Sequence, residues 1–334
     1  MPTTTTQNAS VAYNGEFAGE YISAALLSAS TIENGGITVK PNVKYQHVIK
    51  TVSTDDIVKD ASCDFTATST ITLDERTLTP EFQQVNLQLC KADFQDDWEA
   101  LSMGFSAHQS LPTQFSDFLI AHVAAKVAQR TEQSIWTGST ATSGQFDGLS
   151  TKLGADANLP TANEIAGTTV TSSNVISELG SVVDAIPSTL YGSEDLYIYV
   201  SQNIFRAYVR ALGGFSSVAI KNVAGTENVG GAGIGGNGVN GLGTTFYQNG
   251  GLTFDGVKLF VANGLADNDM IAAEKSNLYF GTGLLSDHNE VKVLDMADLD
   301  GSQNVRVVMR FTAGVEYGIV DDIVTYGIAN TAND

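Results

Sequence analysis

The stretch TQFSDFLIAHVAAKVAQRTEQSIWTG, from Thr113 to Gly138, carries the strongest helical pattern in the chain. Apolar side chains and one histidine recur there at i, i+3, i+4, i+7, i+8 and i+12, which places them on one face of an α-helix. This stripe consists of Phe115, Phe118, Leu119, His122, Val123 and Val127. Thr113 can cap the first turn, and Gly138 can supply the left-handed residue that ends many helices. The helix would be roughly 35 Å long, which suits a structural strut.

The residues before this helix predict an extended region. Residues 1–15 are polar and Thr-rich, as in a flexible arm, and residues 16–29 have near-helical apolar spacing. STITLDERTLTP and EFQQVNLQLCKADF, which together span residues 69–94, both alternate apolar and polar side chains, so we expect them to pair as a long hairpin. An isolated two-stranded ribbon is marginally stable in water, so it should lie on another surface of this or another subunit. A further short helix is expected over residues 91–104.

The residues after the strut helix predict a mixed lobe of helices and strands. Residues 172–187 form a helix with Val175, Leu179, Val182 and Ile186 inward, and the nearly all-apolar residues 195–201 form a buried strand. Residues 201–214 read as the next helix. Strands are then expected within 252–264, 277–283 and 291–296, followed by two closing strands joined near Ala313 and Gly314.

The composition restricts the classes of function. The 334 residues carry 17 Lys and Arg against 37 Asp and Glu, a net charge of −20, which repels nucleic acid and anionic membranes at long range. Cys63 and Cys90 form no C-x-x-C pair, which favours a reducing compartment. The first residues contain no basic segment followed by an apolar run, so we expect no secretory signal, and the sequence contains no apolar run long enough to span a membrane.

A glycine-rich stretch, VGGAGIGGNGVNGLGT at residues 229–244, contains G-x-G-x-x-G twice. In a dinucleotide site this pattern follows a buried strand and opens a helix, so that backbone N–H groups reach a pyrophosphate. Here a loop precedes it, and a turn leading into a strand follows it, with Asp255 in a turn. We therefore interpret the glycines as a loop that adapts to its neighbours. A nucleotide-dependent enzyme remains the alternative, and Gly233→Ala would abolish its ligand binding.

No motif assembles a catalytic or metal site. The four histidines are scattered, and the chain lacks H-E-x-x-H, G-x-S-x-G and the Walker A lysine. Asp295, Asp298 and Asp300 lack the spacing of a calcium loop, so a solvated acidic turn is favoured over a weak cation site. We expect no enzyme activity, no cofactor and no metal.

The order of elements, together with TEQSIWTG followed by FDGLSTKL, DLYIYVSQNIFRAYVRAL and FGTGLLSDHNEVKVLDM, resembles major capsid proteins of tailed phages. The resemblance implies the α+β Hong Kong 97-type fold. It divides the chain into an N-terminal arm with a short helix (1–43), an extended β-hairpin or E-loop (44–89), a peripheral domain with a long spine helix (91–167 and 290–327), an axial domain (168–289) and a C-terminal tail (328–334).

The resemblance also implies a function. The protein would be a structural virion component, assembled in the host cytoplasm as hexamers and pentamers of an icosahedral capsid that encloses double-stranded DNA without sequence preference. Its partners would be a portal and, in some shells, decoration proteins. A separate scaffolding protein is also expected, because the N-terminal arm is short, unless the precursor differs from this sequence. No membrane is involved. We expect inter-subunit ion pairs from Lys59, Asp60, Arg76, Glu81 and Arg130, with ordinary solvated surface as the equal alternative. A tail-tube or decoration protein is the other structural alternative, and the strut helix argues against it.

Overall fold

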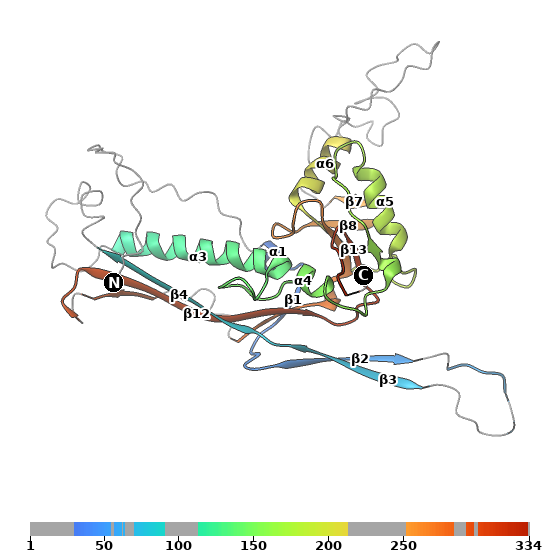
Figure 1. Ribbon diagram of the computed structural model, residues 1–334, viewed down its shortest axis with the longest axis horizontal. Coiled ribbons are helices and arrows are strands. Elements are labelled where there is room, and N and C mark those ends of the chain that lie inside the picture. Colours follow the sequence, from blue (N-terminus) through green and yellow to red (C-terminus); the bar gives the residue numbers. More distant parts are fainter. Residues whose placement is uncertain are drawn as a thin grey trace, which may run out of the picture.

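The long helix α3 (Thr113–Thr137) lies along one face of two long strands, β4 (Glu81–Cys90) and β12 (Asn304–Tyr317) (Figure 1). The computed structural model describes residues 30–54, 57–61, 63, 70–90, 113–212, 252–283, 292–296 and 300–332. The two strands pair antiparallel, from Asn304 opposite Cys90 to Ala313 opposite Glu81. Alternate side chains face α3 and are buried, as a sheet with one covered face requires. These are Val305, Val307, Met309 and Phe311, with the half-buried Val85, Leu87 and Leu89 packed against them.

Three shorter strands complete this five-stranded sheet. On the edge of β12 opposite β4, β10 (Leu278–Thr282) and β11 (Lys292–Asp295) pair antiparallel with it. β1 (Thr38–Lys40) then adds parallel to β10. The expected strands within 277–283 and 291–296 are thereby confirmed.

The strut helix is confirmed, although its end differs from the prediction. Val123 and Val127 are buried on the predicted stripe, and His122 is half-buried; the side chains before His122 lie outside the described residues. Gly138 does not adopt the left-handed conformation. A Cβ at Gly138 would instead lie 2.3 Å from the carbonyl oxygen of Phe146, so glycine is needed there for the close approach of the next loop.

The second lobe is a six-stranded sheet packed against helices α5 (Val175–Ala185) and α6 (Gln202–Leu212). The predicted inward residues of α5 are all buried, and both helices were expected from their periodicity. The strands, in sheet order, are β5 (Glu164–Ile165), β13 (Val324–Tyr326), β9 (Met270–Glu274), β6 (Leu196–Val200), β8 (Val257–Val261) and β7 (Thr253–Phe254). The remaining elements are the short helices α1 (Ser30–Glu33) and α4 (Leu149–Leu153) and the 3₁₀ turns η1 (Thr161–Asn163) and η2 (Lys275–Asn277).

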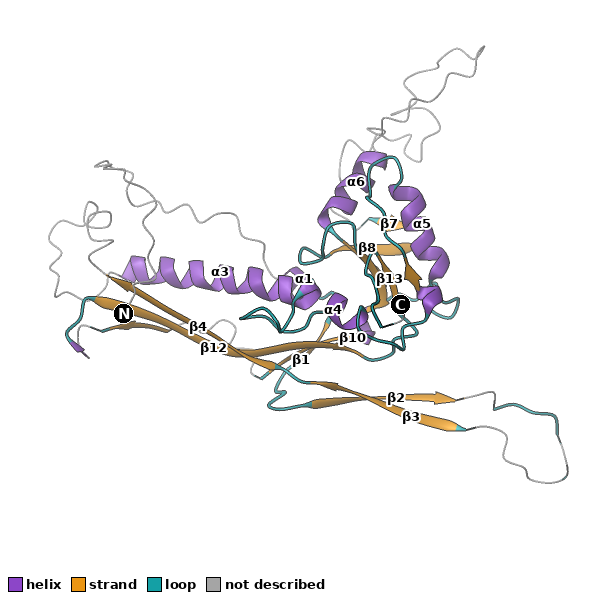
Figure 2. Ribbon diagram, viewed as in Figure 1, coloured by secondary structure: helices purple, strands orange, loops and turns teal. Residues whose placement is uncertain are grey.

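A two-stranded ribbon, β2 (His47–Thr54) paired with β3 (Ile71–Leu78), projects from the body (Figure 2). The predicted pairing of residues 69–80 with 81–94 is wrong, since β4 leaves the ribbon and joins β12 instead. Alternation shows that one face of a strand is buried but does not identify the partner strand. The apolar side chains of β4 find burial beneath α3, which a projecting ribbon does not offer.

The closing strands also differ from the prediction. β12 runs without a break through Ala313 and Gly314 to Tyr317, and the chain turns only over residues 318–323. Gly314 marks a close approach rather than a turn, because a Cβ there would lie 2.9 Å from the Cα of Pro80. The helices expected at 16–29 and 91–104 and the glycine-rich stretch at 229–244 lie outside the described residues.

Candidate functional site

The ribbon β2–β3 is anchored to the body at its base. Leu78 at the end of β3 is fully buried, and Ile49 on β2 is 8% exposed. A Cβ at Gly281 of β10 would lie 2.7 Å from Cδ2 of Leu78, so this leucine sits in a space left by glycine. The backbone N–H of Val43 donates to the Thr282 carbonyl at 3.0 Å. These contacts hold the base of the ribbon against β10.

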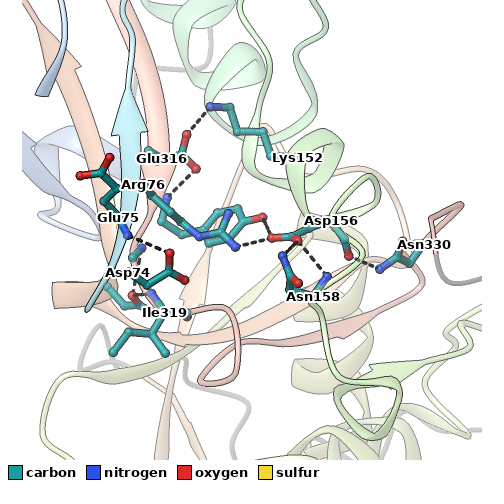
Figure 3. Close-up of polar contacts among 12 residues, drawn as sticks. Asp74, Glu75, Arg76, Lys152, Asp156, Asn158, Glu316, Ile319 and Asn330 are labelled. Carbon is teal, nitrogen blue, oxygen red and sulfur yellow. Dashed lines mark hydrogen bonds and ion pairs between the residues drawn. The ribbon is translucent and has the colours of Figure 1, made fainter. Parts of the chain in front are cut away.

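Arg76 on β3 reaches from the ribbon to the body (Figure 3). Its Nη2 donates to Oδ2 of Asp156 at 2.5 Å, and its guanidinium lies 4.4 Å from the ring centre of Tyr317. The Tyr317 hydroxyl donates to the same Asp156 oxygen at 2.7 Å. One carboxylate therefore holds both the ribbon and the end of β12.

The protonation states agree with this arrangement. Burial alone would raise the pKa of Asp156, but hydrogen bonds from Tyr317, Asn158 and Arg76 outweigh burial and lower it. Burial would lower the pKa of Arg76, but the hydrogen bond to Asp156 and the attraction of Tyr317, Asp156 and Glu316 together outweigh burial and raise it. Burial, followed by the hydrogen bond to Asp156, raises the pKa of Tyr317. At neutral pH the cluster therefore holds a charged ion pair and a neutral phenol.

A second ion pair and a C-terminal contact extend this group, which we call the ribbon-base cluster. Lys152 Nζ contacts Glu316 Oε2 at 2.7 Å, and Asn330 Nδ2 donates to the Asp156 carbonyl at 2.8 Å. The two acids are each 9% exposed, whereas the side chains of Arg76 and Lys152 are 24% and 27% exposed. Networks of this kind contribute more to stability than isolated surface pairs. The cluster joins β3, the segment after α4, the end of β12 and the C-terminal segment.

Beyond its base the ribbon has an apolar face that nothing in the described subunit covers. Val52 pairs with Leu73 and Thr54 with Ile71, so their side chains share one face. Val52, Ile71 and Leu73 are 63%, 65% and 74% exposed. Exposed apolar side chains on a two-stranded ribbon indicate a surface that another molecule covers.

A buried carboxylate ties the strut helix to the N-terminal side of the chain. Glu132 on α3 is 1% exposed; its Oε2 accepts from the Thr31 N–H at 3.0 Å and its Oε1 from the Thr31 hydroxyl at 2.6 Å. Trp136 Nε1 donates to the same hydroxyl at 2.9 Å. Burial raises the pKa of Glu132 despite these donors. This junction fixes the position of α1 against the end of the strut helix.

The five residues expected at subunit contacts are spread over the molecule. Lys59 and Asp60 are exposed beyond β2, and Glu81 is exposed at the start of β4. Arg130 is exposed on α3, where its Nη1 donates to Gln133 Oε1 at 3.3 Å. Arg76 is engaged by Asp156 within the subunit. A single subunit does not bring the five together, so their role between subunits stays a prediction.

The sequence did not reveal the ribbon-base cluster. Arg76 and Asp156 are 80 positions apart, and no predicted helix or strand included Asp156. The one available signal was Glu316, a carboxylate in an apolar strand, because a buried charge requires a partner.

Within the described ranges, no group of His, Cys, Asp and Glu side chains is placed to hold a metal ion. Asp295 and Asp300 belong to that part of the chain, but Asp298 does not. Cys63 and Cys90 are both free thiols. No described helix combines the length and apolar character that crossing a membrane requires.

Comparison with solved structures places this architecture among phage capsids, although no family model and no curated protein matches the sequence. The capsid structure of the cyanophage P-SCSP1u is 14% identical with a TM-score of 0.54, and the match covers 96% of both chains. The capsid of the native GTA particle is 12% identical with a TM-score of 0.56, over 96% of this chain and 99% of that one. The capsid of Myoviridae phage XM1 is 13% identical with a TM-score of 0.53, over 91% and 93%. At these identities the similarity is one of fold.

Proposed function

We propose that this chain, which has the α+β Hong Kong 97-type fold of phage capsid proteins, is a major capsid protein that assembles into hexamers and pentamers of an icosahedral shell. The fold similarity carries the proposal, because it extends over 96% of this chain and of the P-SCSP1u capsid chain. In this proposal the protein is a virion component, is assembled in the host cytoplasm and encloses double-stranded DNA. Its role is structural, and it catalyses no reaction.

The uncovered ribbon supports an assembling protein over one that acts as a monomer. No described residue of the same subunit covers the apolar side chains of its outer part, so they gain burial when another molecule packs on them. The ribbon base, by contrast, is held by the Arg76–Asp156 ion pair and the buried Leu78. A fixed base and an unpartnered outer part suit an element whose partner lies in the next subunit.

The domain division follows the same proposal. The sheet of β1, β4, β10, β11 and β12 with α3 corresponds to the peripheral domain, and the six-stranded lobe with α5 and α6 corresponds to the axial domain. In this division β10 joins the peripheral sheet, and β5 and β13 join the axial lobe, unlike in the bounds expected from the sequence. The ribbon proper ends at Leu78, since β4 belongs to the peripheral sheet. A portal, a scaffolding protein and, in some shells, decoration proteins are the partners that such assembly calls for.

The net charge also fits a DNA container. At −20, the subunit does not attract DNA at long range, so packaged DNA can slide against the shell without being gripped.

The test is negative-stain electron microscopy with sedimentation velocity, on the protein expressed alone and with its neighbouring gene products. We expect closed shells, or hexamers and pentamers. Leu73→Asp on the apolar face of the ribbon should reduce assembly strongly, whereas Thr72→Asp, its neighbour on the opposite face, should reduce it less. A protein that stays monomeric under every condition would refute the proposal, and micromolar binding of NAD or ATP by calorimetry would favour the enzyme alternative.

A further inference from the structure

We propose that the groove between α3 and β4 is a docking site for an extended acidic segment of a second protein, which adds to the sheet as a strand beside β4. We call this site the β4 groove. Figure 1 shows α3 running along β4 over most of the length of the strand. The inference goes beyond the proposed function, because it concerns the unassembled subunit and does not require that shells form.

The first observation is that β4 is an edge strand. Within the described part of the chain it pairs only with β12, from Glu81 opposite Ala313 to Cys90 opposite Asn304. A strand that is paired on one side directs every second backbone N–H and C=O away from its partner. These groups can bind a further strand, which is how many proteins recognise an extended peptide at the edge of a sheet.

The second observation is a cavity of about 410 Å³ beside this strand. Gln83, Val85 and Leu87 of β4 form one wall. The other wall is a row of α3 side chains at i, i+4, i+8 and i+12, namely His122, Lys126, Arg130 and Ser134. The more buried part of the lining is largely apolar and includes Val123, Val127, Phe146 and Phe311. Val85 and Leu87 are only half-buried although they pack against this core, so an added strand would complete their burial.

The dimensions of the β4 groove suit one short strand. From residue 122 to residue 134 the row on α3 rises about 18 Å at 1.5 Å per residue, and residues 83–87 extend about 16 Å at 3.3 Å per residue. Lys126 and Arg130 are one helical turn apart, a rise of about 6 Å, and alternate residues of a strand are about 6.6 Å apart. Carboxylates at alternate positions of an incoming strand therefore match the two cations.

The charge of the β4 groove favours an acidic occupant. Lys126 and Arg130 are exposed, and the described residues that line the groove include no Asp or Glu. Arg130 Nη1 donates to the neutral Gln133 Oε1 at 3.3 Å, and among the described residues neither cation has an ion-pair partner. Two such cations above an apolar floor, in a chain of net charge −20, complement a segment that carries both carboxylates and apolar side chains.

The small size of the β4 groove points to a separate protein rather than to a permanent contact between subunits. It accommodates about five residues of an extended chain, whereas a stable interface engages about 20–30 residues on each side. A single contact is therefore weak and reversible. It becomes firm only when one partner presents several such segments to several subunits at once.

Fluorescence anisotropy with a labelled peptide tests the site on unassembled subunits. In the probe, glutamates and valines occupy alternate positions and threonines lie between them, so that carboxylates and apolar side chains share one face of the strand. We expect saturable binding that weakens as salt is added, because exposed charges are screened. A probe with lysine in place of glutamate should not bind. Absence of saturable binding by the glutamate probe at millimolar concentration would overturn the inference.

Charge variants locate the bound probe. Lys126→Glu combined with Arg130→Glu should weaken binding at least about tenfold, whereas Lys126→Arg combined with Arg130→Lys should retain it. Arg310→Glu is the matched control, because Arg310 is an exposed cation on the opposite face of the same sheet. It should leave binding unchanged. Equal binding by the double glutamate variant, with its melting temperature preserved, would contradict the assignment of the two cations.

Amide hydrogen exchange tests whether the probe adds as a strand. The β4 amides that point away from β12 should exchange fast in the free subunit and more slowly with the glutamate probe bound, while amides of β6 in the other lobe keep their rates. Binding without protection of β4 would overturn strand addition. Slow exchange of these amides in the free subunit would assign the edge to another segment of the same chain. Protection that increases with subunit concentration would assign it to a second copy. Each of these results removes the inference and leaves the proposed function standing.

Discussion

Arg76→Ala should loosen the ribbon without unfolding the body. The change removes a part-buried ion pair with Asp156 and the stacking of the guanidinium on Tyr317 at 4.4 Å. Asp156 keeps its hydrogen bonds from Tyr317 and Asn158, so no buried charge is stranded. The ion pair contributes about 1 kcal/mol and the cation–π contact about as much, for a total of about 2 kcal/mol.

That free energy corresponds to an opening equilibrium of the ribbon about thirtyfold more favourable, because 1.4 kcal/mol is a factor of ten. Amide hydrogen exchange of unassembled subunits, followed by mass spectrometry, measures it directly. Amides of β2 and β3 should exchange about thirtyfold faster in the variant, while those of β6 in the other lobe should keep their rates, since the opening is local.

Lys152→Ala is the matched control. Lys152 has similar exposure and a similar ion pair, with Glu316, but neither partner lies on the ribbon. Its loss should leave exchange in β2 and β3 unchanged. A change below about threefold in Arg76→Ala, or an equal effect from Lys152→Ala, would refute the view that Arg76 sets the position of the ribbon.

Three further predictions concern the body. Burial, and then the charge of Asp267, raises the pKa of Asp269 to about 6. Since this exceeds the unfolded value, the stability that Asp269 contributes is present below about pH 4 and is lost as the pH rises through 6. Asp269→Asn should flatten this dependence in urea midpoints measured from pH 4 to 7, and an unchanged slope would contradict the assignment. Gly264→Ala would place a Cβ 2.1 Å from the Glu132 carbonyl oxygen and should lower the melting temperature sharply. Gly180→Ala in α5, with open space around it, should stabilise by up to about 1 kcal/mol; equal melting temperatures would count against this contrast. Glu132→Ala should cost about 2–4 kcal/mol in denaturant unfolding, because it leaves the Thr31 N–H without its acceptor and opens a cavity; a loss below about 1 kcal/mol would mean that the junction contributes little.

The predictions that the structure confirms are those in which local periodicity reports burial. Val175, Leu179 and Val182 of α5, and Ile186 directly after it, pack into one core, as the helical spacing predicted. The apolar run of β6 likewise indicated a strand buried on both faces. Such patterns identify the buried face of a helix or strand without any information about the element that packs on it.

The predictions that failed required knowledge of a partner far along the chain. β4 and β3 have the same alternation, yet β3 pairs with β2 and β4 pairs with β12. Gly138 and Gly314 were interpreted from turn chemistry, whereas each makes room for a distant backbone atom. The ribbon-base cluster and the Glu132 junction join residues 80 and 101 positions apart, and no spacing rule spans such distances.

The amino-acid sequence by itself determined which segments are helices and strands, which of their faces are buried, and that the subunit carries a large net negative charge. The order of its helices and strands also indicated the capsid fold, because that order follows directly from the sequence. Only the tertiary structure decided which strand joins which sheet, where the ribbon is anchored, and which surfaces are left uncovered. Those choices depend on competition between burial sites for the same apolar strand. They also depend on charged groups that come together only when the chain folds. The carboxylate of Asp156, for example, is buried only where Arg76 and Tyr317 donate hydrogen bonds to it.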